Sequence, residues 1–199
     1  MNPRVIRMLL ILGAGVAGLV FSFVVVLLIN GPTSSPSVQQ TANIGGPFRL
    51  TDQNGKTFTD QDLKGRPFLV FFGFTHCPEV CPTTLFEVSE ILRKLGPDAD
   101  RVGALFVTID PERDTAPVLK DYLSSFDPHL AALTGELADI TAVAKAYRAY
   151  FKKVPLEGSD YTMDHTAIVY LMDKQGRFVS PFSIKRAADV SVADLRKQL

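Results

Sequence analysis

The chain opens with one long apolar segment and continues with shorter apolar runs separated by polar ones. Residues 8–29 include no charged side chain. As a helix, this segment would span about 33 Å, which matches the hydrocarbon core of a bilayer, roughly 30 Å thick. It is longer than the apolar core of a cleavable signal peptide, and no small-residue cleavage site follows it. We therefore expect an uncleaved transmembrane anchor.

The charges around this segment predict its orientation. Arg4 and Arg7 precede it, and the next basic residue is Arg49. The positive-inside rule then keeps residues 1–7 in the cytoplasm and sends the rest of the chain across the inner membrane. No Arg- and Ser-rich transit segment precedes the anchor, which favours the periplasm over the mitochondrial intermembrane space.

After the anchor, the composition changes twice. Residues 30–44 are rich in Pro, Gly, Ser, Thr, Gln and Asn, which is typical of a flexible linker. Residues 45–199 then form the predicted folded domain. The whole chain has 21 basic and 21 acidic residues, and two of the basic ones precede the anchor, so the domain carries a charge of about −2. This weak charge argues against nucleic acid as a partner.

The first half of the domain alternates between strand and helix patterns. Asn54-Gly55 lies between two short alternating runs and predicts a β-hairpin. Near-continuous apolar runs at 66–74 and 101–110 predict strands buried on both faces. Between them, an amphipathic helix is predicted to begin at Pro82. A strand, a helix and a strand in this order predict a parallel pair with a right-handed crossover.

The second half continues with further helices and strands. We expect helices at 115–126 and 137–151, a short strand at 129–133, two strands within 167–182, and a last short helix. Parallel strands first and an antiparallel hairpin last predict an α/β sandwich with a mixed central sheet. A thioredoxin-like, or peroxiredoxin-like, fold has this order of elements.

The only two cysteines, Cys77 and Cys81, follow the strand at 66–74. Ligands bind at the carboxyl ends of parallel strands, and a helix N-terminus should make a thiol ionise more easily. A structural disulfide here would close so short a loop that it would stabilise little. Two possible roles for the cysteines remain, as a redox pair or as two ligands of a metal site. The C-x-x-x-C spacing differs from the C-x-x-C of thioredoxin-type enzymes but still permits a disulfide.

His165 offers a third metal ligand. We expect it immediately before the first strand of the C-terminal hairpin, and an antiparallel arrangement would bring it to the same end of the sheet as Cys77. Thioredoxin-type oxidoreductases carry a proline there, whereas this chain has Asp164-His165. Two thiolates and one imidazole form a soft site that favours Cu(I), with zinc as a competitor. Structural zinc normally takes four protein ligands, and only three good ones are present.

Four other residues with potential ligand atoms have simpler interpretations. We expect His76 to point away from its neighbour and hydrogen-bond locally, and His129 to be exposed to solvent. Met163 and Met172 are predicted to be packing residues, not thioether ligands.

Three motifs in order resemble the Sco/SenC family. They are FFGFTHCPEVCPTTL at 71–85, TIDPERDT at 108–115 and DHTA at 164–167, where the family commonly has Ser in place of Thr166. The resemblance covers roughly residues 45–182. It implies a membrane-anchored, thioredoxin-fold copper protein that assists assembly of cytochrome c oxidase by delivering copper to the Cu(A) centre of subunit II.

The resemblance also implies that Cys77, Cys81 and His165 bind the copper. Asp164 is expected in an outer-shell role beside the histidine. Three charged residues of the second motif, Asp110, Arg113 and Asp114, have two interpretations. Local hydrogen bonds can hold the loop, or the loop can form a docking surface near the metal. Both stay open from the sequence.

The leading hypothesis is a copper carrier and not an enzyme. Its two thiols must be reduced before they bind copper, which implies an upstream thiol reductase as well as a copper donor. The alternative is a thiol–disulfide oxidoreductase that reduces the cysteines of the oxidase subunit's copper site. A peroxiredoxin-like peroxidase is disfavoured, because Thr75 does not have the T-x-x-C spacing to Cys77.

Overall fold

A computed structural model describes Pro3 and residues 18–26, 44–158 and 160–199. The chain divides into two units, Met1–Gln40 and Thr41–Leu199. In the first unit, residues 18–26 are helical, and the rest of the predicted anchor lies outside the described residues. No helix within the described ranges is both long and apolar enough to span a membrane. The anchor therefore stays a prediction.

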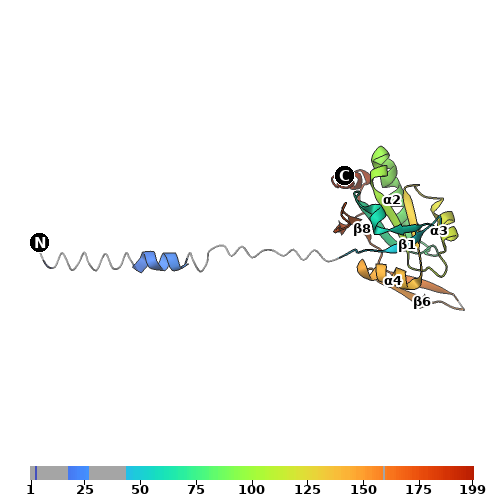
Figure 1. The fold of residues 1–199 in the computed structure, drawn as a ribbon, viewed down its shortest axis with the longest axis horizontal. Coiled ribbons are helices and arrows are strands. Elements are labelled where there is room, and N and C mark those ends of the chain that lie inside the picture. The colour runs from blue at the N-terminus through green and yellow to red at the C-terminus, as the bar shows by residue number, and fades with distance from the viewer. Residues whose placement is uncertain (1–2, 4–17, 27–43, 159) are drawn as a thin grey trace. The chain divides into compact units, whose positions relative to one another are not determined.

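The second unit is built on a mixed seven-stranded sheet (Figure 1). Its strands are β1 (Arg49–Asp52), β2 (Thr57–Thr59), β3 (Phe68–Gly73), β4 (Gly103–Thr108), β5 (Leu130–Thr134), β8 (Val169–Met172) and β9 (Phe178–Pro181). They lie in the order β2-β1-β5-β4-β3-β8-β9. Strands β3, β4 and β5 are parallel, whereas β8 is antiparallel to both β3 and β9. The predicted mixed sheet is confirmed.

Helices cover the sheet and complete the core. They are α2 (Val80–Leu95), α3 (Ala116–Leu123), α4 (Leu137–Ala146) and α5 (Ala188–Arg196), with two short 3-10 helices, η1 (Asp60–Leu63) and η2 (Gly96–Arg101). Helices α2 and α5 pack together, and α4 lies on the other side of the sheet (Figure 1). Every residue of β3 and β4 is buried, which explains why both strands are apolar almost throughout.

The helix after the cysteines begins earlier than predicted. Helix α2 starts at Val80, so Pro82 is its third residue and Cys81 lies inside the first turn. The prediction that the helix begins at Pro82 is wrong. Proline is tolerated throughout a first turn because the N–H groups there have no partner within the helix, so it does not mark the first residue uniquely.

The predicted helix at 137–151 is also too long, because α4 ends at Ala146. Two residues later, Arg148 adopts a left-handed backbone with φ of 54°, and the N–H of Ala149 bonds back to the carbonyl of Ala144 at 2.8 Å. Glycine normally occupies such a helix-ending position, so an arginine there carries no stop signal in the sequence.

The chain after α4 forms a hairpin that the sequence pattern did not predict. Strands β6 (Phe151–Pro155) and β7 (Tyr161–His165) pair antiparallel in a two-stranded sheet of their own. His165 was expected just before a strand of the C-terminal hairpin, but it is instead the last residue of β7. The neighbouring strand β8 begins only at Val169, and its antiparallel pairing with β3 is as predicted.

Candidate metal centre

The two cysteines lie where β3 leads into α2. Cys77 is half-buried in the connecting loop, while Cys81 is fully buried in the first turn of the helix, and both are free thiols. The backbone N–H of Cys81 donates to the sulfur of Cys77 at 3.3 Å. This N–H has no carbonyl partner within the helix, so the sulfur occupies the position of a helix cap. The positive end of the helix dipole therefore faces that sulfur.

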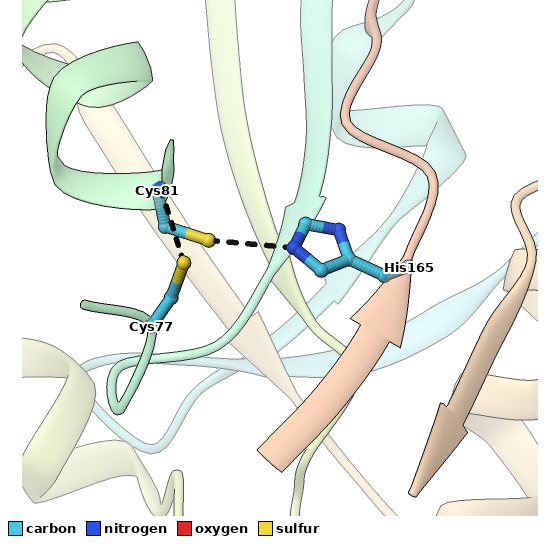
Figure 2. A group of neighbouring side chains, drawn as sticks. All are labelled: Cys77, Cys81 and His165. Atoms are coloured by element: carbon cyan, nitrogen blue, oxygen red, sulfur yellow. Dashed lines mark hydrogen bonds between the residues drawn. The ribbon is translucent and has the colours of Figure 1, made fainter. Parts of the chain in front are cut away.

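His165 points at this pair from the end of β7 (Figure 2). Its Nε2 atom lies 3.7 Å from the sulfur of Cys81. The possible ligand atoms of Cys77, Cys81 and His165 all lie within 4.8 Å of one another. Two sulfurs and one ring nitrogen thus converge from a loop, a helix and a strand, and one metal ion placed between them can contact all three.

The hydrogen bond on the far side of the ring defines the protonation of His165. Its Nδ1 lies 3.2 Å from the carbonyl oxygen of Thr166. A carbonyl can only accept, so Nδ1 carries the proton when this bond forms. In the neutral ring, Nε2 then has a free lone pair directed at Cys81. Metal-binding histidines are commonly oriented in this way by a partner on the other nitrogen.

Apolar groups enclose the site on the side of the core. The rings of Phe71 and Phe74 meet the His165 ring edge-on, with centroids 6.2 Å and 5.8 Å away. Below the sulfur of Cys81, β3 ends at Gly73. A Cβ at this position would lie 2.8 Å from that sulfur and 2.7 Å from the ring of Phe106. The absence of a side chain at Gly73 therefore makes room for the buried thiol.

Loss of contact with water changes the pKa values of Cys81 and His165. It raises the pKa of the Cys81 thiol well above its usual value, and the nearby Cys77 acts in the same direction. The expectation that a helix N-terminus makes the thiol ionise more easily is therefore wrong for Cys81, because burial takes the thiolate out of water. Burial also lowers the pKa of His165, so the ring is neutral at pH 7 and able to bind a metal.

The loop after β4 contains the second motif, and the two aspartates of the motif are buried. Asp110 and Asp114 are 2% and 0% exposed. Asp114 accepts hydrogen bonds from the backbone N–H of Thr75 at 3.0 Å and from the hydroxyls of Thr75 and Thr108, both at 2.6 Å. Asp110 pairs with Arg113 at 2.5 Å. These bonds favour the interpretation that the motif holds the loop in place.

The other residues singled out in the sequence lie outside this group of three. Asp164 is exposed on β7 beside His165. His76 is exposed, and its Nδ1 lies 3.1 Å from the hydroxyl of Thr75. His129 is exposed and contacts Asp127 at 2.6 Å. Met163 and Met172 are buried in the core, as expected for packing residues.

Sequence reasoning missed the roles of Thr75 and Tyr161, which hydrogen-bond to the aspartates of the second motif. It also missed that Thr108, within the motif, donates to Asp114. Tyr161 opens β7, and its hydroxyl donates to Asp110 at 2.8 Å. The short apolar-polar run at 151–155, followed by a turn with Gly158 in a left-handed backbone, was the signal for this hairpin.

Comparison with known proteins identifies similar chains. The SCO1/SenC family model matches residues 36–199. The SCO2-like protein RP587 of Rickettsia prowazekii is 39% identical over 147 residues, covering 73% of this chain and 72% of that protein. The mitochondrial SCO1 homolog of Mus musculus is 42% identical over 152 residues, covering 74% of this chain and 54% of that protein. This chain thus aligns with about half the length of the mouse protein.

A solved structure extends the similarity to three dimensions. The copper-bound structure of ScoI from Bradyrhizobium japonicum is 62% identical to this chain and superimposes with a TM-score of 0.77. The match covers 78% of this chain and 99% of that one.

Proposed function

The chain belongs to the SCO1/SenC family, and we propose that it is a membrane-anchored copper carrier that delivers copper to the Cu(A) centre of cytochrome c oxidase subunit II during assembly. Sco structures similar to this chain have copper bound. The observation that carries the proposal is the convergence of Cys77, Cys81 and His165 within 4.8 Å.

The chemistry of these side chains fits copper as the cargo. Thiolates and imidazole are the soft ligands that Cu(I) prefers, and three of them match its trigonal coordination. Both thiols must lose their protons to bind the metal, so loading releases protons and depends on pH. Cys77 is the more exposed of the two sulfurs, so an incoming thiolate of a partner reaches the copper from its side.

The anchor and the compartment belong to the same proposal. Residues 8–29 hold the chain in the inner membrane, with residues 1–7 in the cytoplasm and residues 45–199 in the periplasm, joined by the linker at 30–44. The periplasm is oxidising, so an upstream thiol reductase keeps Cys77 and Cys81 reduced, and a separate donor supplies the copper.

A second candidate function uses the cysteines without the histidine. Both thiols are free, and Cys77 is the accessible one. Its thiolate would attack a disulfide of the oxidase subunit, forming a mixed disulfide and releasing one partner thiolate. The Cys81 thiolate would then attack the sulfur of Cys77, forming the Cys77–Cys81 bond and releasing the second partner thiolate. The partner's disulfide gains two electrons, and Cys77–Cys81 becomes the oxidised pair. This reaction has no role for His165.

Copper binding by the reduced full chain, measured beside His165→Ala, tests the proposal. Competition with a coloured Cu(I) chelator gives the stoichiometry and affinity, and the thiolate-to-Cu(II) absorption reports on the ligands. We expect one copper per chain, and a loss of affinity of at least about tenfold in the variant. Binding that is indifferent to His165 would favour thiol–disulfide exchange.

A further inference from the structure

The strand that carries His165 has no place in the main sheet. Among the residues that the structure describes, strand β7 pairs with β6 alone, in a separate two-stranded sheet. We propose that Asp110, Arg113 and Tyr161 form a brace that positions His165 against the two cysteines for copper binding. The three are positioning residues that act through the histidine, and the inference rests on the proposed copper site.

The brace joins the start of β7 to the loop after β4. The hydroxyl of Tyr161 donates to Oδ1 of Asp110 at 2.8 Å. Arg113 donates from Nε to Oδ2 of the same carboxylate at 2.5 Å, and from Nη1 to the backbone carbonyl of Tyr161 at 3.0 Å. Its guanidinium also stacks on the Tyr161 ring, 3.8 Å from the centroid. Four contacts thus connect three residues, so each one limits the movement of the other two.

The same loop also holds the cysteine side of the site. Asp114 accepts hydrogen bonds from both the backbone N–H and the hydroxyl of Thr75, two residues before Cys77. The loop itself continues from β4, whose residues are all buried in the middle of the sheet. Residues 110–114 therefore contact the segments that lead to the cysteines and to the histidine, and they define the spacing between them.

Because Tyr161 and His165 lie on the same strand, fixing the position of Tyr161 also restricts the position of His165. Alternate residues of a strand face the same side, so Tyr161, Met163 and His165 share one face. Met163, between the other two, is buried. The two ends of this face lie about 13 Å apart at the usual rise of a strand. A stiff strand held at Tyr161 and packed at Met163 leaves the imidazole little freedom to move.

Because the Asp110–Arg113 ion pair is largely buried, the loss of a single hydrogen bond should disturb the brace. Asp110 is 2% exposed, and the side chain of Arg113 is 18% exposed. Charges that are removed from water depend on their few protein partners, so each hydrogen bond to them counts for more than it would at the surface. The Tyr161→Phe change removes one such bond and keeps the ring that stacks on Arg113.

A double-mutant cycle tests the brace. Copper affinity is measured by chelator competition for the full chain, Tyr161→Phe, His165→Ala and the double variant, with unfolding temperature as a check on the fold. The matched control is Tyr150→Phe, which loses a hydroxyl just before β6. Tyr150 is 54% exposed, and within the described ranges its hydroxyl has no hydrogen-bond partner.

We expect Tyr161→Phe to weaken copper binding about tenfold when His165 is present and less than twofold when it is alanine. The thiolate-to-Cu(II) absorption should shift in Tyr161→Phe and not in Tyr150→Phe. An unchanged affinity, or an equal loss in both backgrounds, would overturn the brace. If Tyr161→Phe does not fold, Asp110→Ala removes the acceptor of the same bond. If His165→Ala alone binds copper normally, the proposed function fails instead.

Discussion

The sulfur of Cys81 lies 3.7 Å from Nε2 of His165, although the two residues are 84 positions apart in the chain. One lies in the first turn of α2 and the other at the end of β7. The buried thiol and the imidazole nitrogen with its free lone pair are thus two neighbouring candidate metal ligands.

The two cysteines should differ in reactivity in the reduced, copper-free chain. Cys81 is 0% exposed and burial raises its pKa, whereas Cys77 is half-buried in the loop. Alkylation by iodoacetamide requires an accessible thiolate. We expect Cys77 to react at least about tenfold faster than Cys81. Mass spectrometry with peptide fragmentation locates the label, and in denaturant the two rates should converge. Equal rates in the native chain would contradict this prediction.

Replacing Gly73 with alanine should damage both the fold and the site. The added Cβ would lie 2.7 Å from the Phe106 ring and 2.8 Å from the sulfur of Cys81, which is closer than such atoms normally approach. Overpacking of this kind costs about 1–3 kcal/mol, and we expect weaker copper binding because the sulfur must move. Urea unfolding and copper titration measure the two effects.

The control for this change is Gly46→Ala. Its Cβ would meet only the Cβ of Ala146, at an ordinary distance of 3.5 Å. A loss of stability in this variant as large as that in Gly73→Ala would show that contact with Cys81 and Phe106 is not the cause.

The carboxylate of Asp114 should make stability depend on pH. Burial raises its pKa, although hydrogen bonds from Thr108 and Thr75 act in the opposite direction. The folded chain then binds this proton more tightly than the unfolded chain, whose Asp pKa is about 3.9. The contribution of Asp114 to the free energy of unfolding is therefore largest at low pH and falls as pH rises from about 4 through the raised pKa.

The Asp114→Asn variant isolates this effect. The other titrating groups contribute equally to the free energies of unfolding of both chains, so their contributions cancel in the difference. The stability of the native chain minus that of the variant, measured by urea unfolding, should decrease between pH 4 and pH 7. A difference that grows over this interval would mean that the pKa of Asp114 is lowered in the folded chain.

The pKa values of His129 and His165 should lie on opposite sides of the usual histidine pKa, which is about 6.5. The hydrogen bond to Asp127 raises the pKa of His129, whereas burial lowers that of His165. Proton NMR of the copper-free chain measures both, and His129→Gln and His165→Gln assign the signals. A His165 signal that titrates at or above that of His129 would mean that water reaches the imidazole.

The sequence pattern located most of the fold correctly. Strands β3 and β4 are buried on both faces, so their apolar runs stand out from the surrounding sequence. The hairpin of β1 and β2 was recognisable because Gly55 has a positive φ of 78°, which the Asn-Gly turn supplies. These features depend on a few neighbouring residues, and the sequence displays them directly.

The errors occurred where distant contacts override local preference. Helix α4 ends early because Arg148 adopts a left-handed backbone without a glycine. Strand β7 carries an exposed Asp164 and a half-buried His165, so it lacks the apolar character of a core strand. Its first residue, Tyr161, contacts Asp110, 51 positions earlier in the chain, and no local pattern reveals such a contact.

By itself, the sequence determined the identity of the three candidate metal ligands and the chain order of the strands of the main sheet, because ligand chemistry and apolar periodicity are properties of the residues themselves. Only the tertiary structure decided which sulfur is buried, which nitrogen of His165 faces it, and what positions the histidine. Each of these depends on desolvation and hydrogen bonds between segments far apart in the chain, such as β3, the loop after β4 and β7.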